Sequence, residues 1–273
     1  MSEKVWFITG ASRGFGRQWA IAALKRGDKV AATARDTDTL TDLVESYGAA
    51  ILPIKLDVTD RADDFAAVKC AHDHFGRLDI VVNNAGYGHL GFVEELTEQQ
   101  ARAQIETNVF GALWITQAAL PYLRAQRSGH IIQVSSIAGI TAFPNGGIYA
   151  ASKWALEALS QSLAQEVASF GVHVTRIEPG LFATGWAGCA THSDPLPDYQ
   201  QAHADAERVR AQRIAAPGDP TASASAILKV VDDPNPPLRV FFGELPLALA
   251  KADYEIRLKT WEEWQPVALE AQG

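Results

Sequence analysis

The segment Val5-Trp6-Phe7-Ile8-Thr9-Gly10-Ala11-Ser12-Arg13-Gly14-Phe15-Gly16 joins an apolar run to a glycine-rich turn. An apolar run of strand length followed by a helix-forming stretch predicts a buried parallel strand and the helix after it. Glycines keep such a turn tight and let backbone N–H groups approach a pyrophosphate, whose charge is favoured at a helix N-terminus. The spacing is G-x-x-x-G-x-G instead of G-x-G-x-x-G, but its setting between strand and helix is the one the mechanism needs. The segment therefore predicts a dinucleotide-binding turn.

The alternation of apolar runs and helical segments continues along the chain. Strands are expected at 5–9, 29–34, 51–56, 78–82, 131–135, 173–178 and 240–242, and helices at 14–26, 37–47, 61–75, 97–127, 149–170, 199–214, 221–231 and 247–264. Short crossovers between such units favour a right-handed parallel topology. We therefore expect an α/β fold, a doubly wound parallel sheet of about seven strands with helices on both faces.

The domain organisation expected from this pattern is one Rossmann-fold unit over residues 1–273. The interval 181–217 interrupts the pattern with several glycines and prolines and follows the C-terminal end of a strand. Long insertions at that place are more often lids than linkers, so we expect a substrate lid there. Residues 243–273 are expected to form a C-terminal extension.

Composition narrows the class of ligand. A formal net charge of -8 argues against nucleic-acid binding, which normally requires a basic face. Cys70 and Cys189 are far apart and form no Cys-x-x-Cys motif, so neither a disulfide framework nor a metal site is expected. No apolar run reaches the roughly 18 residues needed to span a bilayer, and the N-terminus lacks signal-peptide features. We expect a cytoplasmic protein with a small-molecule ligand and no membrane partner.

Tyr149 and Lys153 lie four residues apart on a predicted helix, which places their Cβ atoms about 5–6 Å apart on one face. A free tyrosine titrates near about pH 10, so it needs help to exchange protons at neutral pH. An ammonium roughly 4 Å away supplies about 4 kcal/mol at an effective dielectric of about 20. Ser136, at the end of a predicted strand, is placed to hold a carbonyl oxygen beside the tyrosine hydroxyl. Alone, the pair is equally compatible with chance on an amphipathic helix.

The choice between NAD and NADP is indicated by the end of the second predicted strand. NAD enzymes of this architecture usually place a carboxylate there to hold the ribose 2′-hydroxyl. Here Ala34 and Arg35 occupy that place, and Arg35 can pair with a 2′-phosphate, with Arg13 as a second cation. Asp36 and Asp38 are close enough to complicate this choice, but capping of the following helix explains them better. We therefore predict NADP(H).

With both motifs identified, the chain resembles the short-chain dehydrogenase/reductase family over roughly residues 5–184, and more loosely its NADP-preferring retinol and 17β-hydroxysteroid dehydrogenase-like members. The match rests on Asp57-Val58, Asn83-Asn84-Ala85-Gly86, Asn108, Ser136, Tyr149 with Lys153, and Pro179-Gly180 followed by Thr184. The resemblance, together with the turn and Arg35, implies cofactor contacts from Gly10, Ser12, Arg13, Gly14, Phe15, Gly16, Arg35, Asp57, Val58, Asn84, Ala85, Gly86, Tyr149, Lys153, Pro179, Gly180 and Thr184.

The resemblance also implies roles in a reaction that interconverts a carbonyl compound and an alcohol. Tyr149 would exchange a proton with the substrate oxygen, and Ser136 would orient that oxygen. Lys153 would lower the pKa of the tyrosine and bind the nicotinamide ribose. Asn108 would hold a water that links the lysine to solvent. A homodimer or homotetramer is implied as well.

Substrate selection is expected from residues near these motifs. The candidates are Tyr87, His89, Leu90, Phe143, Asn145 and Trp186. The aromatic content indicates an apolar or bulky ketone, aldehyde or secondary alcohol. A non-catalytic NADP-sensing regulator is the main alternative, although it would be expected to lose Tyr149 or Lys153. An epimerase or dehydratase is disfavoured because its glycine turn usually reads G-x-x-G-x-x-G.

Overall fold

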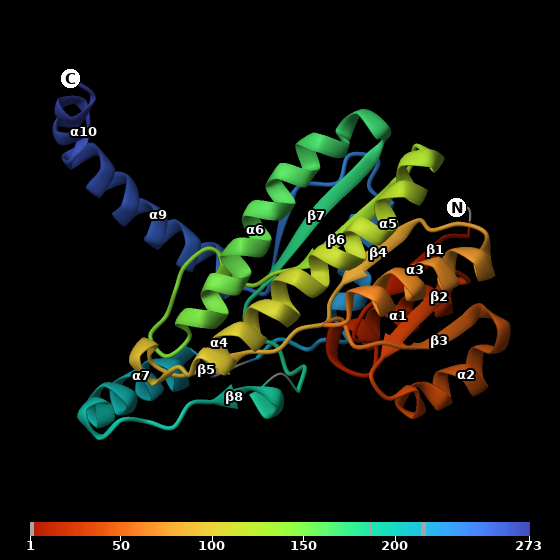
Figure 1. The fold of residues 1–273 in the computed structure, drawn as a ribbon, viewed down its shortest axis with the longest axis horizontal. Helices are drawn as coiled ribbons and strands as arrows, with labels where there is room; N and C mark the ends of the chain where they lie inside the picture. The colour runs from red at the N-terminus through yellow and green to blue at the C-terminus, as the bar shows by residue number, and fades with distance from the viewer. Residues whose placement is uncertain (1–2, 186, 214–216) are drawn as a thin grey trace.

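A computed structural model describes residues 3–185, 187–213 and 217–273 (Figure 1). Seven parallel strands form one sheet in the order β3-β2-β1-β4-β6-β7-β9. They are β1 (Val5–Ile8), β2 (Lys29–Ala34), β3 (Ile51–Lys55), β4 (Ile80–Asn83), β6 (Gly129–Val134), β7 (Val172–Pro179) and β9 (Arg239–Phe242). This order reverses direction between β1 and β4, the place where open α/β sheets bind their ligands. The predicted doubly wound fold is confirmed.

Helices cover both faces of the sheet. Helices α1 (Gly14–Arg26) and α8 (Ser223–Asp232) pack together on one face, with α2 (Thr41–Tyr47) nearby, while α3 (Arg61–Phe75), α5 (Ala112–Gln126) and α6 (Gly147–Val167) cover the other. Strand β1 shows how the sequence divides the core between these layers. Trp6 and Ile8 pack into the α1 layer, whereas Val5 and Phe7 pack into the α3 and α5 layer. Side chains alternate along a strand, so a run that is apolar throughout is buried on both faces.

The single helix expected over residues 97–127 is in fact three segments. Helix α4 (Glu98–Ile105) continues through a π-helical stretch, Glu106–Gly111, into α5. Gly111 lets this stretch pack closely on the loop after β3, because a Cβ at that position would lie 2.8 Å from the Val58 carbonyl oxygen. A π-helical segment inside a longer helix is often found at a functional site. Here it carries Asn108.

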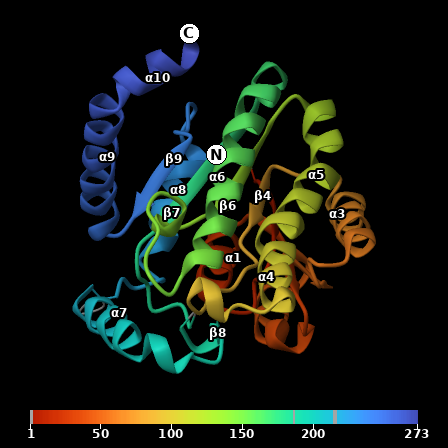
Figure 2. The same cartoon turned by 60° about the vertical axis from the view of Figure 1, so that its left-hand side comes forward.

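Two parts of the fold lie outside the sheet and its covering helices. Strands β5 (His89–Leu90) and β8 (Thr191–His192) form a small parallel pair, next to which lies α7 (Gln200–Arg213). Helices α9 (Leu245–Glu263) and α10 (Gln265–Gln272) run away from the body in both views (Figures 1 and 2). Trp261 and Trp264 on this extension are 57% and 64% exposed. Within the described residues, no helix combines the length and apolar character needed to cross a bilayer.

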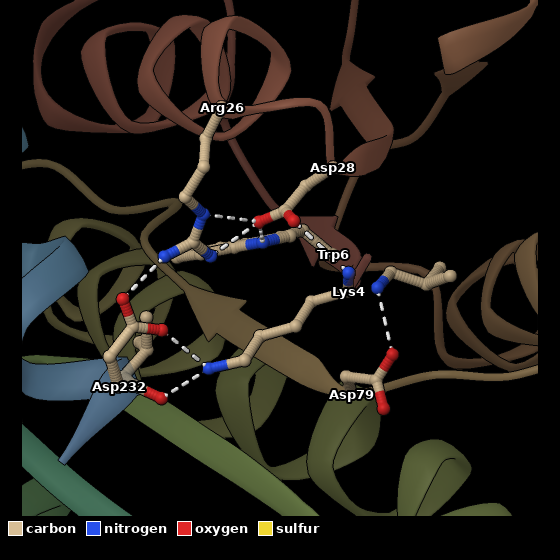
Figure 3. Close-up of polar contacts among 8 residues, drawn as sticks. Lys4, Trp6, Arg26, Asp28, Asp79 and Asp232 are labelled. Carbon is tan, nitrogen blue, oxygen red and sulfur yellow. Dashed lines mark hydrogen bonds and ion pairs between the residues drawn. The ribbon is translucent and has the colours of Figure 1, made fainter. Parts of the chain in front are cut away.

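The amino ends of the strands are joined by an ionic cluster, here called the basal cluster, of Lys4, Arg26, Asp28 and Asp232 (Figure 3). Asp28 accepts hydrogen bonds from the Trp6 indole at 2.8 Å and from the Arg26 guanidinium. Arg26 and Lys4 each donate to Asp232 at 2.7 Å. The cluster ties the start of β1 to the ends of α1 and α8.

Candidate active site

A cavity of about 1040 Å³ runs along the carboxyl edge of the sheet. It brings together most of the residues predicted from sequence: Gly10, Ser12, Arg13, Gly14, Phe15, Arg35, Asp57, Val58, Asn84, Ala85, Gly86, Tyr87, Leu90, Ser136, Phe143, Asn145, Tyr149, Lys153, Pro179, Gly180 and Thr184. Three predicted residues, Gly16, Asn108 and His89, do not line it. Trp186 lies outside the described residues.

The glycine-rich turn is shaped by close backbone approaches. Gly10 and Gly14 have φ angles of +65° and +57°, which favour glycine, and a Cβ on Gly14 would lie 3.1 Å from Thr184. A Cβ on Gly16 would lie 2.5 Å from the Asn84 amide nitrogen. That nitrogen donates to the carbonyl oxygens of Thr9 at 2.8 Å and Gly10 at 3.0 Å. Gly16 therefore acts by admitting Asn84 against the turn and does not itself face the cavity.

Two arginines stand at the end of the cavity formed by the turn and by β2. Arg13 and Arg35 are both exposed and line the cavity, and neither pairs with an acidic side chain among the described residues. Asp36 accepts a hydrogen bond from the Asp38 backbone N–H at 3.1 Å and caps the 3₁₀ turn Thr37–Leu40. The capping role expected for Asp36 is thus confirmed. The positive charges here suit a phosphate, and the residue directly after β2 is Arg35, not an acid.

The catalytic candidates meet in the middle of the cavity. Ser136 follows β6, and Tyr149 and Lys153 lie one turn apart on α6. A hydrogen bond joins the side chains of Ser136 and Tyr149. The Lys153 amine lies 5.9 Å from the centre of the Tyr149 ring and donates to the Val134 carbonyl oxygen at 2.8 Å. A substrate oxygen bound between the two hydroxyls would have a proton donor on one side and an orienting group on the other.

The electrostatics of the pair differ from the sequence-based expectation. Burial raises the pKa of Tyr149 to about 12, although the hydrogen bond with Ser136 acts in the opposite direction. Burial also lowers the pKa of Lys153 to about 8, while the Glu157 carboxylate opposes this change. The expectation that Lys153 brings the tyrosine pKa towards neutral is not met in this geometry. Desolvation of the phenolate has the largest effect on the pKa of Tyr149. The Lys153 amine does not offset it, because its hydrogen bond goes to the Val134 carbonyl oxygen.

Asn108 is buried and does not line the cavity. Its amide oxygen accepts from the Tyr87 backbone N–H at 3.1 Å, and its amide nitrogen donates to the Tyr87 carbonyl oxygen at 3.0 Å and to Ser152 at 3.0 Å. The side chain thereby fixes the backbone of Tyr87, which does line the cavity. The water-holding role stays a prediction.

The placement of His89 corrects the sequence-based expectation for the substrate site. Its ring nitrogens contact Thr191 at 2.7 Å and Ser193 at 2.8 Å, and it is buried between β5 and β8. Because side chains alternate along a strand, the next residue, Leu90, faces the cavity instead. His89 anchors the small sheet and does not line the cavity.

The remaining described substrate candidates, Tyr87, Phe143 and Asn145, line the cavity as expected. Burial raises the pKa of the Tyr87 hydroxyl, so it is a neutral hydrogen-bonding group. Asn145 has a φ angle of +66°, and its carbonyl oxygen accepts from the Gly91 N–H at 3.1 Å. This bond fixes the segment that leads into α6, on which Tyr149 lies.

Sequence reasoning missed the residues that close the substrate end. Further lining side chains come from the β5 region, from the segment after β7 and from α7 and α9: Phe92, Leu181, Phe182, Ala202, Ala206, Val209, Leu245 and Leu249. Helix α7 is fastened to the body by His203, which contacts Glu95 at 2.6 Å and stacks on Phe92 at 4.1 Å. Nothing in the local pattern identifies these contacts, because they join segments about a hundred residues apart.

Comparison with known proteins identifies the family. The family model for short chain dehydrogenases matches residues 4–193. The chain belongs to the short-chain dehydrogenase family. Among similar members, the oxidoreductase BOA17 of Botryotinia fuckeliana is 42% identical over 269 residues, 97% of this chain and 98% of that protein. A 3-ketodihydrosphingosine reductase of Bacteroides thetaiotaomicron is 35% identical over 250 residues, 90% of each chain.

Solved structures of short-chain dehydrogenases share the fold closely. A short-chain dehydrogenase from Streptomyces avermitilis is 38% identical and superposes with a TM-score of 0.92 over 99% of this chain and 98% of its own. A Burkholderia phymatum member in complex with NAD is 27% identical, with a TM-score of 0.82 over 94% of this chain and 95% of its own. Neighbours with NADP bound are also found, at 25% identity and a TM-score of 0.74 for ElxO, covering 88% of this chain and 98% of that one. Family members of this fold therefore bind either nucleotide, and the sequence of this chain has to decide between them.

Proposed function

We propose that the protein is an NADP(H)-dependent oxidoreductase that interconverts a ketone or aldehyde and the corresponding alcohol. The observation that supports this most directly is the hydrogen-bonded pair of Ser136 and Tyr149 in the cavity wall, one helical turn from Lys153. NADPH, when bound, supplies the hydride. Tyr149 gives its proton to the substrate oxygen in the reductive direction, Ser136 holds that oxygen in place, and the Lys153 ammonium stabilises the phenolate left behind.

The residues of the cavity fit a dinucleotide. The turn leaves room for a pyrophosphate because Gly10 and Gly14 carry no side chain, and the α1 N-terminus begins at this turn. The preference for NADP is supported by Arg13 and Arg35, which line the cavity without an acidic partner among the described residues. Asp36 does not compete for a ribose hydroxyl because its carboxylate caps the next turn.

The substrate end of the cavity favours an apolar or bulky carbonyl compound. Phe92, Phe143 and Phe182, with leucines from three segments, line this end. A similar family member reduces a 3-keto compound according to its name. Residues 181–217 would act as the lid, with α7 presenting Ala202, Ala206 and Val209 to the substrate. Closure of such a lid would exclude water from the site of hydride transfer.

The proposal is tested by fluorescence titration of the purified protein with NADPH and NADH, followed by assay of a panel of ketones and aldehydes. Tight NADPH binding with turnover of a bulky apolar ketone would support the proposal. Binding without turnover over a broad panel, also of the oxidative reaction, would instead favour the non-catalytic NADP-sensing regulator. A failure to bind either nucleotide would refute both.

Assembly and location stay proposals that rest on the family resemblance. A homodimer or homotetramer would place α5 and α6 of neighbouring copies together. Phe110, 37% exposed, stacks on Trp114 at 5.7 Å on this side of the molecule and would suit such a contact. A cytoplasmic location is part of the same proposal.

A further inference from the structure

A second ionic cluster lies behind Lys153, inside the protein. It consists of Glu157 on α6 with Arg176 and Glu178 on β7, and we call it the inner cluster. Arg176 and Glu178 are 0% exposed and Glu157 is 7% exposed. The Arg176 guanidinium donates to the Glu157 carbonyl oxygen at 2.6 Å and lies 2.9 Å from its carboxylate. Arg176 therefore fixes both the backbone and the side chain of Glu157.

The inner cluster holds more carboxyl groups than fully buried cations. Burial and, after it, the neighbouring Glu157 side chain raise the pKa of Glu178 to about 8, although Arg176 and Arg239 act in the opposite direction. Both Glu178 oxygens are buried, and neither accepts a hydrogen bond from a described residue. A buried carboxyl oxygen without a hydrogen-bond donor is typical of a protonated acid. Protonated Glu178 can donate a hydrogen bond to Glu157. At neutral pH Glu178 is therefore a neutral acid beside the Glu157 side chain.

The position of Glu157 connects this cluster with the catalytic lysine. Tyr149, Lys153 and Glu157 follow one another at four-residue intervals on α6, so they share one helix face. Gly139 lets the helix approach the end of β6, since a Cβ there would lie 2.9 Å from Glu157 Cγ and 3.2 Å from the Lys153 carbonyl oxygen. Glu178 directly precedes Pro179 and Gly180, which line the cavity. The cluster thus supports both the lysine and the wall of the nucleotide site.

We propose that Glu157 is a positioning residue that keeps the Lys153 amine protonated in the closed site, with Arg176 and Glu178 holding its carboxylate in place. The amine lies in a buried position that disfavours its charge, and its hydrogen bond among the described residues goes to a neutral carbonyl group. The Glu157 carboxylate is the acidic group that opposes this loss of charge. The proposal rests on the proposed function, in which the ammonium stabilises the tyrosine phenolate.

The other charged and titratable groups around the cluster come from three elements. Arg239 on β9 lies 3.9 Å from a Glu178 carboxylate oxygen and is 44% exposed at its side chain. Tyr254 on α9 faces Arg176. Tyr149 lies on the far side of Lys153. Within the site, Glu178 and Lys153 both have a pKa of about 8. A rise in pH through this range therefore adds negative charge behind the Lys153 amine as the amine begins to lose its proton.

The test is the pH profile of the reductive kcat/KM at saturating NADPH in Glu157→Gln, Glu157→Asp and Glu166→Gln. An opposite charge within reach raises the pKa of an amine by about one to three units, so the alkaline limb of Glu157→Gln should move that far to lower pH. Glu157→Asp keeps the charge and should restore most of the shift. Glu166 is exposed on the same helix and contacts Ser162, so Glu166→Gln is the matched control and should match the wild type. An unchanged alkaline limb in folded Glu157→Gln would overturn the proposal.

Two further measurements keep the proposal testable if Glu157→Gln does not fold. Glu178→Gln resembles the protonated acid in shape but cannot ionise, so its alkaline limb should also move to lower pH, by less. An unchanged limb would count against the proposal. The pKa of Lys153 can also be read directly by NMR of ¹³Cε-labelled lysine, assigned with Lys153→Met. A lower Lys153 pKa in Glu178→Gln would support the proposal even if no carbonyl compound were turned over, and an equal pKa would refute it even if turnover were observed.

Discussion

The two ionic clusters lie at opposite edges of the same sheet and differ in how completely their charges are matched. In the basal cluster, two cations meet two carboxylates, and Asp28 and Asp232 each accept several hydrogen bonds (Figure 3). In the inner cluster, carboxyl and guanidinium atoms are buried without a hydrogen-bond partner among the described residues. Burial is the largest influence on Asp232 and raises its pKa, but Lys4 and Arg26 together lower it overall. For Glu178 burial prevails and the pKa is raised to about 8.

This difference assigns different roles to the two ends of the strands: the basal cluster stabilises the fold, and the inner cluster influences proton transfer. A matched cluster holds its charges over a wide pH range, so it can fasten the amino ends of the strands without taking part in proton transfer. An unmatched cluster changes its charge near neutral pH and so can influence a neighbouring titratable group. The inner cluster is placed beside Lys153, and the basal cluster is at the other end of the sheet. The following experiments test this separation.

The largest effect is expected at the carboxyl edge. Tyr149→Phe removes the proton donor but keeps the ring, so turnover should fall roughly 10²- to 10⁴-fold. The free energy of unfolding should change by no more than about 1.5 kcal/mol, because one hydrogen bond is lost. Steady-state assay together with urea unfolding measures both. Retention of more than about 5% of the wild-type activity would refute the role of Tyr149, because loss of a general acid normally costs more than that.

The matching experiment at the amino edge is Asp28→Ala. The change leaves the buried Trp6 indole without its acceptor and removes one of the two carboxylates that pair with Arg26, so the free energy of unfolding should fall by about 3–5 kcal/mol. At a temperature where the variant stays folded, kcat should be close to that of the wild type. Asp73→Ala, which breaks an exposed pair with Lys69 on α3, is the control and should leave the unfolding midpoint in place. A large fall in kcat for folded Asp28→Ala would show that the two edges are coupled.

A smaller effect is expected in the pH dependence of stability. The pKa of Glu178 is raised to about 8 from an ordinary value of 4.5, so its protonated form stabilises the fold fully below 4.5. This contribution is lost as the pH rises through 8, by at most about 1.4 kcal/mol per pH unit. Urea unfolding between pH 5 and 8, at about three pH values per unit, measures this contribution. The free energy of unfolding of Glu178→Gln should fall less steeply with pH than that of the wild type. Parallel curves would mean that Glu178 is already ionised in the folded protein.

The smallest effect concerns cofactor choice at the carboxyl edge. Arg35→Ala removes one charge-assisted contact with a 2′-phosphate, worth about 1.5–3 kcal/mol, so the Kd for NADPH should rise about 10- to 100-fold. The Kd for NADH should change little, since NADH lacks that phosphate. Fluorescence titration gives both constants, and Arg17→Ala is a control because Arg17 already pairs with Asp42 at 2.5 Å. Equal effects of Arg35→Ala on the two nucleotides would refute the argument for NADP.

Much of the site could be predicted because its residues act through local spacing. Ser136, Tyr149 and Lys153 stand at a strand end and on one helix turn, and the structure brings them to one cavity. Glu157 carried the same signal, since it continues the four-residue interval of Tyr149 and Lys153 on α6. It was missed because a glutamate on a helix is normally exposed, and only Arg176 on a neighbouring strand makes its burial tolerable.

The sequence by itself determined the fold class. It also predicted the glycine-rich turn and the set of Ser136, Tyr149 and Lys153 that line one cavity, because each depends on periodicity or on spacing within one strand-helix unit. The tertiary structure decided which of His89 and Leu90 faces the cavity, because the pairing of β5 with β8 fixes that alternation. It also decided that α7 closes the substrate end and that burial raises the pKa of Tyr149. These properties depend on the loss of water around a group. That loss is set by segments distant in the chain, so no local pattern contains it.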